Sequence, residues 1–165
     1  MAISAETPDW SRERPGRFWD PGRKLLKAIR DYQRLARGGA LGALRRKLIV
    51  LRHRFWSVVT GADIPLNAKI GGGLMIPHPS GIVVHPGAVI GVNCLLMQQA
   101  TLGVREGVSG SPVLGGHVDV GAGAKILGPV RIGDHARIGA NAVVLADVPA
   151  RAVAVGVPAR VIPAS

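Results

Sequence analysis

An aliphatic residue returns at every sixth position through most of the chain after Asp63. One register contains eleven of these positions: Val84, Ile90, Leu96, Leu102, Val108, Leu114, Val120, Ile126, Ile132, Ile138 and Val144. An earlier register contains four: Ile64, Ile70, Ile76 and Ile82. A six-residue period fits neither an amphipathic α-helix nor a free-standing strand. It predicts a solenoid in which each hexapeptide supplies one short strand and one turn of a parallel β-helix.

The composition suits the narrow interior of such a solenoid. Hydrophobic residues make up 47% of the chain and aromatic residues only 4%, so the core must consist mainly of Val, Ile, Leu and Ala. A small or β-branched residue follows most of the periodic positions by four: Ala88, Cys94, Ala100, Val118, Ala124, Val130, Ala136, Ala142 and Val148. Because Cys94, the single cysteine, occupies one of these positions, we expect it to pack in the core rather than to act as a nucleophile.

Two departures from strict repetition indicate where chemistry could take place. The two registers are offset by two residues, since eight positions separate Ile76 from Val84, and the offset falls where His78 is flanked by two prolines. A histidine held in this way at a break in a solenoid is a candidate general base. The second departure is the Gly- and Pro-containing segment 104–113, which we interpret as a loop extruded from the coil. Such loops on rigid scaffolds are frequent binding elements.

The chain ahead of the repeats differs in character. We expect residues 1–60 to form a basic helical segment and residues 61–165 to form the β-helix. Apolar side chains at helical spacing predict helices over 22–37 and 40–59. A solenoid needs its open end covered, and the second helix supplies two aromatic side chains for this purpose, Phe55 and Trp56.

The net charge of +11 is concentrated in the front segment. Residues 1–60 hold 14 Lys and Arg against 5 Asp and Glu, whereas residues 61–165 hold 7 against 5. A solvated helical face or a subunit contact explains this charge, and peripheral contact with an anionic membrane is the alternative. No nucleic-acid-binding motif accompanies the charge, so we expect no nucleic-acid partner. A lone cysteine and an N-terminus without a signal-peptide pattern favour a cytoplasmic protein, and the basic front segment is compatible with a position at the inner face of the membrane.

Several motifs together resemble one family. The runs ADIPLNAKIGGGLMIPHPSGIVVHPGAVIG, QQATLG, VGAGAKILGPVRIGDHARIGANAVVLADVP and VGVPARVI are similar to the serine acetyltransferases among the hexapeptide-repeat acyltransferases. The resemblance covers about residues 61–163. It implies a mainly β fold, a left-handed parallel β-helix preceded here by a short α-helical segment. It also implies acetyl-CoA as co-substrate and a homotrimer with active sites between subunits.

The resemblance also implies roles for particular residues. The catalytic histidine of the family corresponds to His78, and the carboxylate that orients it corresponds to Asp63. A backbone N–H near Gly103 would stabilise the oxyanion. The remaining family contacts, all to coenzyme A, correspond to Gly121, Ala122, Arg137 and Arg160.

The acceptor is where the sequence departs from this family. An acidic residue beside the histidine is replaced by Pro77, and an Arg-His pair in the extruded loop is replaced by Gly110 and Ser111. Arg105, Ser111 and Glu106 of the same loop are candidate substitutes for substrate binding. These differences, and a histidine motif like that of acetyltransferases of surface-polysaccharide synthesis, favour a sugar hydroxyl as acceptor. L-serine is the alternative.

Two other classes of protein compete with an acetyltransferase. A metal enzyme similar to γ-carbonic anhydrase would need three histidines converging on zinc. His78, His85 and His117 are the candidates, but the close histidine pair typical of such enzymes is not evident, so we expect no metal. A non-catalytic scaffold would need no placed base. We expect the two other histidines to face solvent: His53 and His135.

Overall fold

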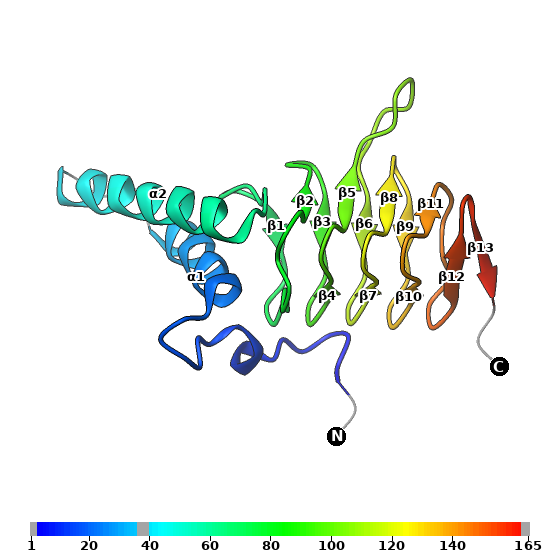
Figure 1. The fold of residues 1–165 in the computed structure, drawn as a ribbon, viewed down its shortest axis with the longest axis horizontal. Helices are drawn as coiled ribbons and strands as arrows, with labels where there is room; N and C mark the ends of the chain where they lie inside the picture. Colours follow the sequence, from blue (N-terminus) through cyan, green and yellow to red (C-terminus); the bar gives the residue numbers. More distant parts are fainter. Residues whose placement is uncertain (1–2, 36–39, 163–165) are drawn as a thin grey trace.

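The computed structural model describes residues 3–35 and 40–162 (Figure 1). A short 3₁₀ helix, η1 (Trp10–Glu13), is followed by two helices, α1 (Pro21–Arg34) and α2 (Ala40–Thr60). Thirteen short strands then follow: β1 (Lys69–Ile70), β2 (Val83–Val84), β3 (Val89–Ile90), β4 (Leu95–Leu96), β5 (Thr101–Gly103), β6 (Val113–Leu114), β7 (Asp119–Val120), β8 (Lys125–Leu127), β9 (Arg131–Ile132), β10 (Arg137–Ile138), β11 (Val143–Val144), β12 (Val153–Gly156) and β13 (Ala159–Ile162).

The strands form three sheets that make up the sides of a coil. One sheet contains β1, β3, β6 and β9, a second β4, β7, β10, β12 and β13, and a third β2, β5, β8 and β11. From β2 to β11 successive strands enter the three sheets in rotation, and every strand pairing in the described residues is parallel except that of β12 with β13. Parallel sheets wound in this order confirm the predicted solenoid.

The six-residue period arises because each strand buries one aliphatic side chain. Ile90, Leu96 and Leu102, for example, are buried, whereas the residue before each of them is only partly buried. Aligned positions on neighbouring coils are 18 residues apart in the regular part, as Val113 and Arg131 are. The inward side chains therefore stack into one continuous apolar core along the axis of the coil.

Two irregularities interrupt the coil where the sequence predicts them. The turn that carries His78 adds two residues, so that Lys69 pairs with Val89, twenty positions later. The loop after β5 adds six, so that Val89 pairs with Val113, and Figure 1 shows this loop projecting from the coil. Val108 lies in the predicted loop although it falls on the hexapeptide register, because an insertion of six residues preserves that register. Val108 is 40% exposed and pairs with Arg105 inside the loop.

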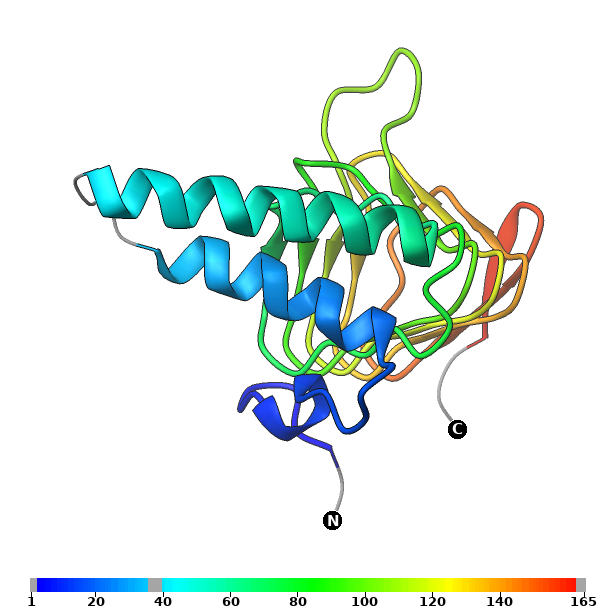
Figure 2. The ribbon, with the colours of Figure 1, turned by 60° about the vertical axis from the view of Figure 1, so that its left-hand side comes forward.

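The two helices run side by side and cover the N-terminal end of the coil (Figure 2). The first helix ends at Arg34, three residues before the predicted end, and residues 36–37 of the prediction lie outside the described residues. The second helix matches the prediction to within one residue. Trp56 packs into the core as expected, but Phe55 is 55% exposed. The expectation for His53 was wrong, because its Nε2 lies 2.9 Å from the carbonyl oxygen of Ile64 in the first coil.

The segment before α1 runs along the outside of the coil (Figure 1). Asn93, buried at a corner of the coil, holds this segment by its side chain: its Nδ2 donates to the carbonyls of Ser4 and Thr7, and its Oδ1 accepts from the N–H of Asp9. Because this segment leads directly into α1, it brings residues 12–20 beside the first coil.

Candidate active site

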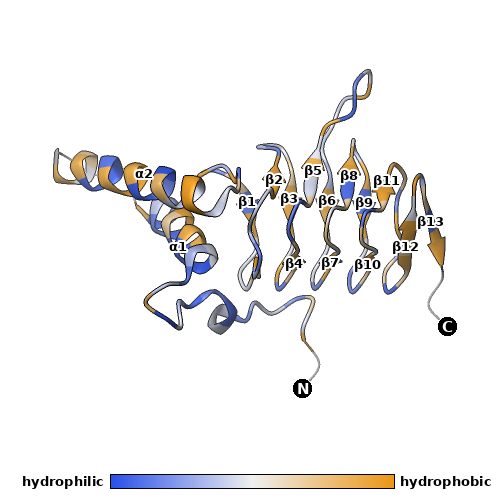
Figure 3. Ribbon diagram, in the orientation of Figure 1, coloured by the Kyte–Doolittle hydropathy of each residue, from blue (hydrophilic) through white to orange (hydrophobic). Residues whose placement is uncertain are grey.

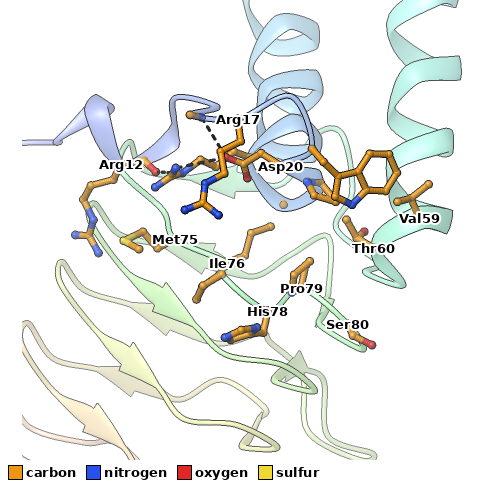
Figure 4. A pocket seen from close by; sticks show the side chains of 16 residues that line it. Arg12, Arg17, Asp20, Val59, Thr60, Met75, Ile76, His78, Pro79 and Ser80 are labelled. Atoms are coloured by element: carbon orange, nitrogen blue, oxygen red, sulfur yellow. Dashed lines mark hydrogen bonds and ion pairs between the residues drawn. The ribbon is translucent and has the colours of Figure 1, made fainter.

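A pocket of about 680 Å³ lies where the N-terminal segment, the two helices and the first coil meet (Figure 4). Its wall includes the turn that carries His78, from Met75 to Ser80, and the end of α2 at Val59 and Thr60. The N-terminal segment and the start of α1 complete it with Arg12, Gly16, Arg17, Trp19, Asp20, Pro21, Gly22 and Arg23. The pocket therefore joins the predicted base to residues far from it in sequence.

The backbone of the coil fixes the position of the His78 turn. The N–H of Gly81 donates to the carbonyl of Gly61 at 2.9 Å, and the N–H of Asp63 donates to the carbonyl of Ile82 at 2.8 Å. Asp63 is thus paired, backbone to backbone, with the end of the turn that carries His78. Their side chains are both exposed, and no hydrogen bond joins them in the part of the chain that the structure describes. Hydrogen bonds of catalytic groups are often absent until substrate binds.

Charged side chains of both signs line the pocket, and the sequence analysis did not identify them. Asp20 accepts from the N–H of Gly16 at 3.2 Å and lies 3.4 Å from Nη1 of Arg23. Arg12 and Arg17 add two more guanidinium groups. The close packing of Gly22 against the first coil positions Asp20, because a Cβ at Gly22 would stand 2.6 Å from the carbonyl oxygen of Ile76. The feature of the sequence that could have pointed to Asp20 is the Asp-Pro-Gly run at the start of the first helix.

The His78 turn and the predicted cofactor residues share one corner of the coil. At this corner, backbone hydrogen bonds link each turn to the next: Gln99 to Ser80, Gly123 to Gln98, and Asn141 to Ala122. Gly121 and Ala122 therefore lie two coils from the His78 turn, which is about 10 Å at the usual spacing of strands. A line along this corner leads from the base to the predicted contacts for coenzyme A.

Most backbone groups of Gly121 and Ala122 already serve the coil. Gly121 donates to Ile138 and accepts from Ala124, and the carbonyl of Ala122 accepts from Asn141. The N–H of Ala122 has no partner among the backbone hydrogen bonds of the described residues. The side-chain oxygen of Gln98, one coil nearer His78, is buried and likewise has no partner among them. A donor and an acceptor thus remain unused along the corner.

The two predicted phosphate contacts lie farther along the same face. Arg137 belongs to β10 and Arg160 to β13, two strands beyond β10 in the same sheet. Ile138 is buried, so the preceding Arg137 points outward, and Arg160 pairs with Val155 at the exposed end of that sheet. Both arginines are exposed.

The other predicted site residues lie away from this pocket within one chain. Gly103 ends β5, and the exposed Arg105 and Glu106 belong to the loop that follows it. Ser111 stands at the end of that loop, where its Oγ lies 3.1 Å from Nδ1 of His85. The N–H of Gly87 donates to the same nitrogen at 3.1 Å, so Nδ1 is an acceptor and the proton of neutral His85 is on Nε2.

His117 and His135 form a close pair that the sequence analysis did not identify. Nδ1 of His117 lies 2.8 Å from Nδ1 of His135, and the rings meet edge to face. The expectation that His135 faces solvent was therefore wrong. Their separation of 18 residues is one coil, and that spacing would have identified the pair. Among residues 3–35 and 40–162, no three His, Cys, Asp or Glu side chains are grouped to hold a metal ion.

Cys94 lies in the core, as its position in the repeat predicts. Its side chain is buried, and its Sγ donates to the carbonyl of Gly115 at 3.2 Å. Burial raises the pKa of the thiol to about 11, so the thiolate is scarce at neutral pH. Cys94 is a packing residue.

Comparison with known proteins agrees with this geometry. The bacterial transferase hexapeptide (six repeats) family model matches residues 111–146. Serine acetyltransferase of Synechococcus elongatus is 46% identical over 107 residues, which is 64% of this chain and 44% of that protein. Serine acetyltransferase of Escherichia coli is 43% identical over 120 residues, 72% of this chain and 44% of that protein. This chain spans less than half the length of these two relatives.

Solved structures extend the likeness beyond the coil. The apoenzyme of soybean serine acetyltransferase superposes with a TM-score of 0.73 at 40% identity, covering 86% of this chain and 57% of that one. A serine acetyltransferase in complex with CoA gives a TM-score of 0.71 at 38% identity, covering 87% and 57%. Residues 61–165 are 105 of 165, so a likeness over 86% also includes part of the front segment. By its coil, its repeats and these relatives, the chain belongs to the serine acetyltransferase family of hexapeptide-repeat transferases.

Proposed function

We propose that this protein is an acetyl-CoA-dependent O-acetyltransferase whose acceptor is L-serine. The observation that carries the proposal is the pocket in which His78 lies with Asp20 and three arginines. The relatives named above are serine acetyltransferases, and their names favour L-serine over the sugar hydroxyl that the sequence analysis favoured. L-serine is therefore the proposed acceptor, and a sugar hydroxyl becomes the alternative.

The pocket offers what a zwitterionic amino acid requires. An α-amino acid needs an anion for its ammonium group and a cation for its carboxylate. Asp20 supplies the anion, and Arg17, which forms no hydrogen bond among the described residues, supplies the cation. These groups come from the N-terminal segment, so the loss of the Arg-His pair from the extruded loop does not remove the means to bind serine.

His78 acts as the general base in the proposed reaction. It takes the proton from the hydroxyl of the acceptor while the oxygen attacks the thioester carbonyl. The tetrahedral oxyanion, stabilised by a backbone N–H near Gly103, then collapses and the carbon–sulfur bond breaks. The departing thiolate receives the proton from His78, which restores the neutral imidazole. Asp63 orients the ring and stabilises its protonated form.

Acetyl-CoA is proposed to lie along the corner that starts at the His78 turn. The N–H of Ala122 and the side-chain oxygen of Gln98, which have no hydrogen-bond partner among the described residues, suit the amide groups of the pantetheine arm. Arg137 and Arg160, about 14 and 24 Å from the coil of His78 at the usual strand spacing, suit phosphate groups. The acetyl group would then reach the pocket while the nucleotide lies toward the C-terminal end.

A neighbouring subunit is proposed to complete the site. The family implies a homotrimer of left-handed coils, in which one subunit's extruded loop can lie over the cleft of the next. Arg105 and Ser111 are then contributed to a partner's acceptor pocket rather than to their own. This arrangement explains why Gly103 and the loop lie away from His78 within one chain.

The acceptor is tested by thiol release from acetyl-CoA with purified protein. L-serine, D-serine, L-homoserine and a panel of sugars and oligosaccharides are compared, and the acetylated product is identified by mass spectrometry. We expect release with L-serine and O-acetylserine as product. Release with sugars alone would overturn L-serine and support the polysaccharide acceptor, and the absence of both turnover and coenzyme A binding would support a non-catalytic scaffold.

A further inference from the structure

The outer side of α2 carries a continuous stripe of exposed apolar side chains. Its members are between 55% and 83% exposed and follow one another at intervals of three and four residues: Leu41, Leu44, Leu48, Leu51, Phe55 and Val58. At 100° per residue these six side chains fall within about 100° of the helix circumference. Figure 3 shows the hydrophobic colour recurring along α2. We call this set the α2 stripe.

The α2 stripe is not the side of the helix that packs on the rest of the chain. On the opposite side, Trp56 is buried and His53 contacts the carbonyl of Ile64. Arg46 donates to the hydroxyl of Tyr32 and Arg52 to Asp31, both on α1. α2 is thus already packed on α1 and the first coil through its other side, and the α2 stripe has no partner within the described chain.

Basic side chains border the α2 stripe. On a helical projection Arg45 lies along one edge, and Lys47 and Arg54 lie along the other. Residues 40–60 contain no Asp or Glu, and residues 1–60 carry an excess of nine positive charges. Long basic side chains can extend their charged ends from an apolar surface toward anionic headgroups.

We propose that the α2 stripe docks on the surface of an anionic lipid bilayer, with α2 lying in the plane of the interface. A helix with aliphatic and aromatic residues on one side and Lys and Arg beside them binds in this way. The seven-residue spacing also suits a coiled-coil partner, but a second copy of α2 would place its basic borders against like charges. No helix in residues 3–35 and 40–162 is long and apolar enough to cross a membrane.

The docked orientation would place the catalytic pocket near the lipid surface. The α2 stripe ends at Val58, and the next residue, Val59, lines the pocket of His78. Trp19, which is 61% exposed and 5.8 Å from the ring of Trp56, lines the same pocket. Phe18 beside it is 91% exposed. These aromatic side chains extend the apolar surface from α2 toward the opening of the pocket.

The test is co-flotation of the full chain with vesicles of phosphatidylcholine alone and vesicles containing 30% phosphatidylglycerol. We expect binding to the anionic vesicles that falls at least tenfold in 0.5 M salt, because screening weakens the contribution of the basic borders. Binding to neutral vesicles should be at least tenfold weaker. Equal binding to both vesicles, or none to either, would overturn the proposal.

Two double variants separate the apolar and electrostatic contributions. Leu48→Gln with Leu51→Gln, and Lys47→Glu with Arg54→Glu, should each reduce anionic-vesicle binding at least tenfold. Matched controls at exposed positions elsewhere, Val155→Gln with Val157→Gln and Lys69→Glu with Arg131→Glu, should reduce it less than twofold. Circular dichroism and thermal melting are measured for each variant, so that loss of binding is scored only in folded protein.

The oligomeric mass distinguishes lipid from a second copy. Light scattering should give the same mass for the wild type and for the Leu48→Gln, Leu51→Gln variant. A smaller mass for this variant would show that the stripe is buried between copies and would overturn lipid docking. Equal loss of vesicle binding in the control variants would overturn it as well.

Discussion

Arg30 and Glu13 form a buried two-pronged ion pair that fixes the N-terminal segment to the first coil. Nε of Arg30 lies 3.0 Å from Oε2 of Glu13, and Nη2 lies 2.8 Å from Oε1. The same guanidinium donates to the carbonyls of Ile70 and Gly71, and Oε1 accepts from the N–H groups of Gly73 and Leu74. All the polar atoms of the pair are thus engaged, which is the condition for burying charge at acceptable cost.

Removing one partner of this pair should strongly destabilise the fold. We expect Glu13→Ala to lower the free energy of unfolding by about 3–5 kcal/mol, because the Arg30 charge would stay buried without its partner. Urea unfolding followed by circular dichroism measures this change. Lys27→Ala, which breaks an exposed pair with Asp31, is the control and should cost less than about 1 kcal/mol. Equal losses in the two variants would contradict the role given to Glu13.

Asp20 and Arg17 should act on serine binding rather than on binding of acetyl-CoA. Asp20→Asn keeps the shape and the contact with Gly16 but removes the charge, and Arg17→Met removes the cation. Each should raise the KM for L-serine about tenfold or more, the usual loss with a charged hydrogen bond. Steady-state kinetics with each substrate varied in turn provide the measurement. Arg14→Met, outside this pocket, should leave both KM values within twofold; a rise in the KM for acetyl-CoA alone would refute the assignment.

The pair of His117 and His135 should make stability sensitive to acid. Burial lowers the pKa of His117, and the nearby His135 and Arg12 lower it further, while Asp119 opposes them. The folded protein therefore binds this proton less readily than the unfolded chain. The contribution of His117 to the free energy of unfolding is fully present above about pH 6.5, and it is lost as the pH falls below this value.

Melting temperatures from pH 7.5 to pH 5 in the wild type and in His117→Asn provide the measurement. Asparagine tolerates the positive φ at this corner, as Asn93 does one coil earlier. The variant should lose less stability on acidification than the wild type. Parallel curves for the two proteins would exclude a contribution from His117.

Cys94 should couple stability to pH on the alkaline side. Its folded pKa of about 11 lies above the value in an unfolded chain, so the folded state favours the neutral thiol. This contribution is complete below about pH 8.5 and is lost as the pH rises through the interval up to about 11. Alanine occupies the equivalent position of the next repeat, at Ala100. Cys94→Ala should therefore fold, and it should lose less stability between pH 9 and pH 11 than the wild type. A disulfide exchange reagent should label the wild type only on unfolding; rapid labelling of the folded protein at pH 8 would contradict the burial.

The repeats could be predicted from the sequence because every coil must bury an aliphatic side chain at the same three sides. The loop after β5 and the insertion at His78 were visible for the same reason, since each disturbs that regularity. Val108 falls on the register of the repeats although it lies in the loop, because the six-residue insertion has the length of a repeat. Periodicity alone cannot distinguish a strand from an insertion of equal length.

The composition of the pocket could not be predicted, since it depends on how the front segment folds back on the coil. Asp20 and Arg17 reach His78 only because Arg30 and Glu13 fix that segment and because Gly22 allows α1 to approach Ile76 closely. No sequence period relates these residues. The contact between His117 and His135, in contrast, follows from the coil length once that length is known.

The most direct test of the account is the kcat/KM for L-serine of His78→Asn, followed by thiol release from acetyl-CoA. Asparagine keeps a polar side chain of similar size but cannot take the proton from the hydroxyl. General-base catalysis contributes about 10²–10⁴-fold, so we expect a loss of that size with melting temperature unchanged and acetyl-CoA still bound. His135→Asn, a histidine outside the pocket, should retain activity within a few-fold. Wild-type turnover by His78→Asn would contradict the assignment of His78 as the base and with it the proposed site.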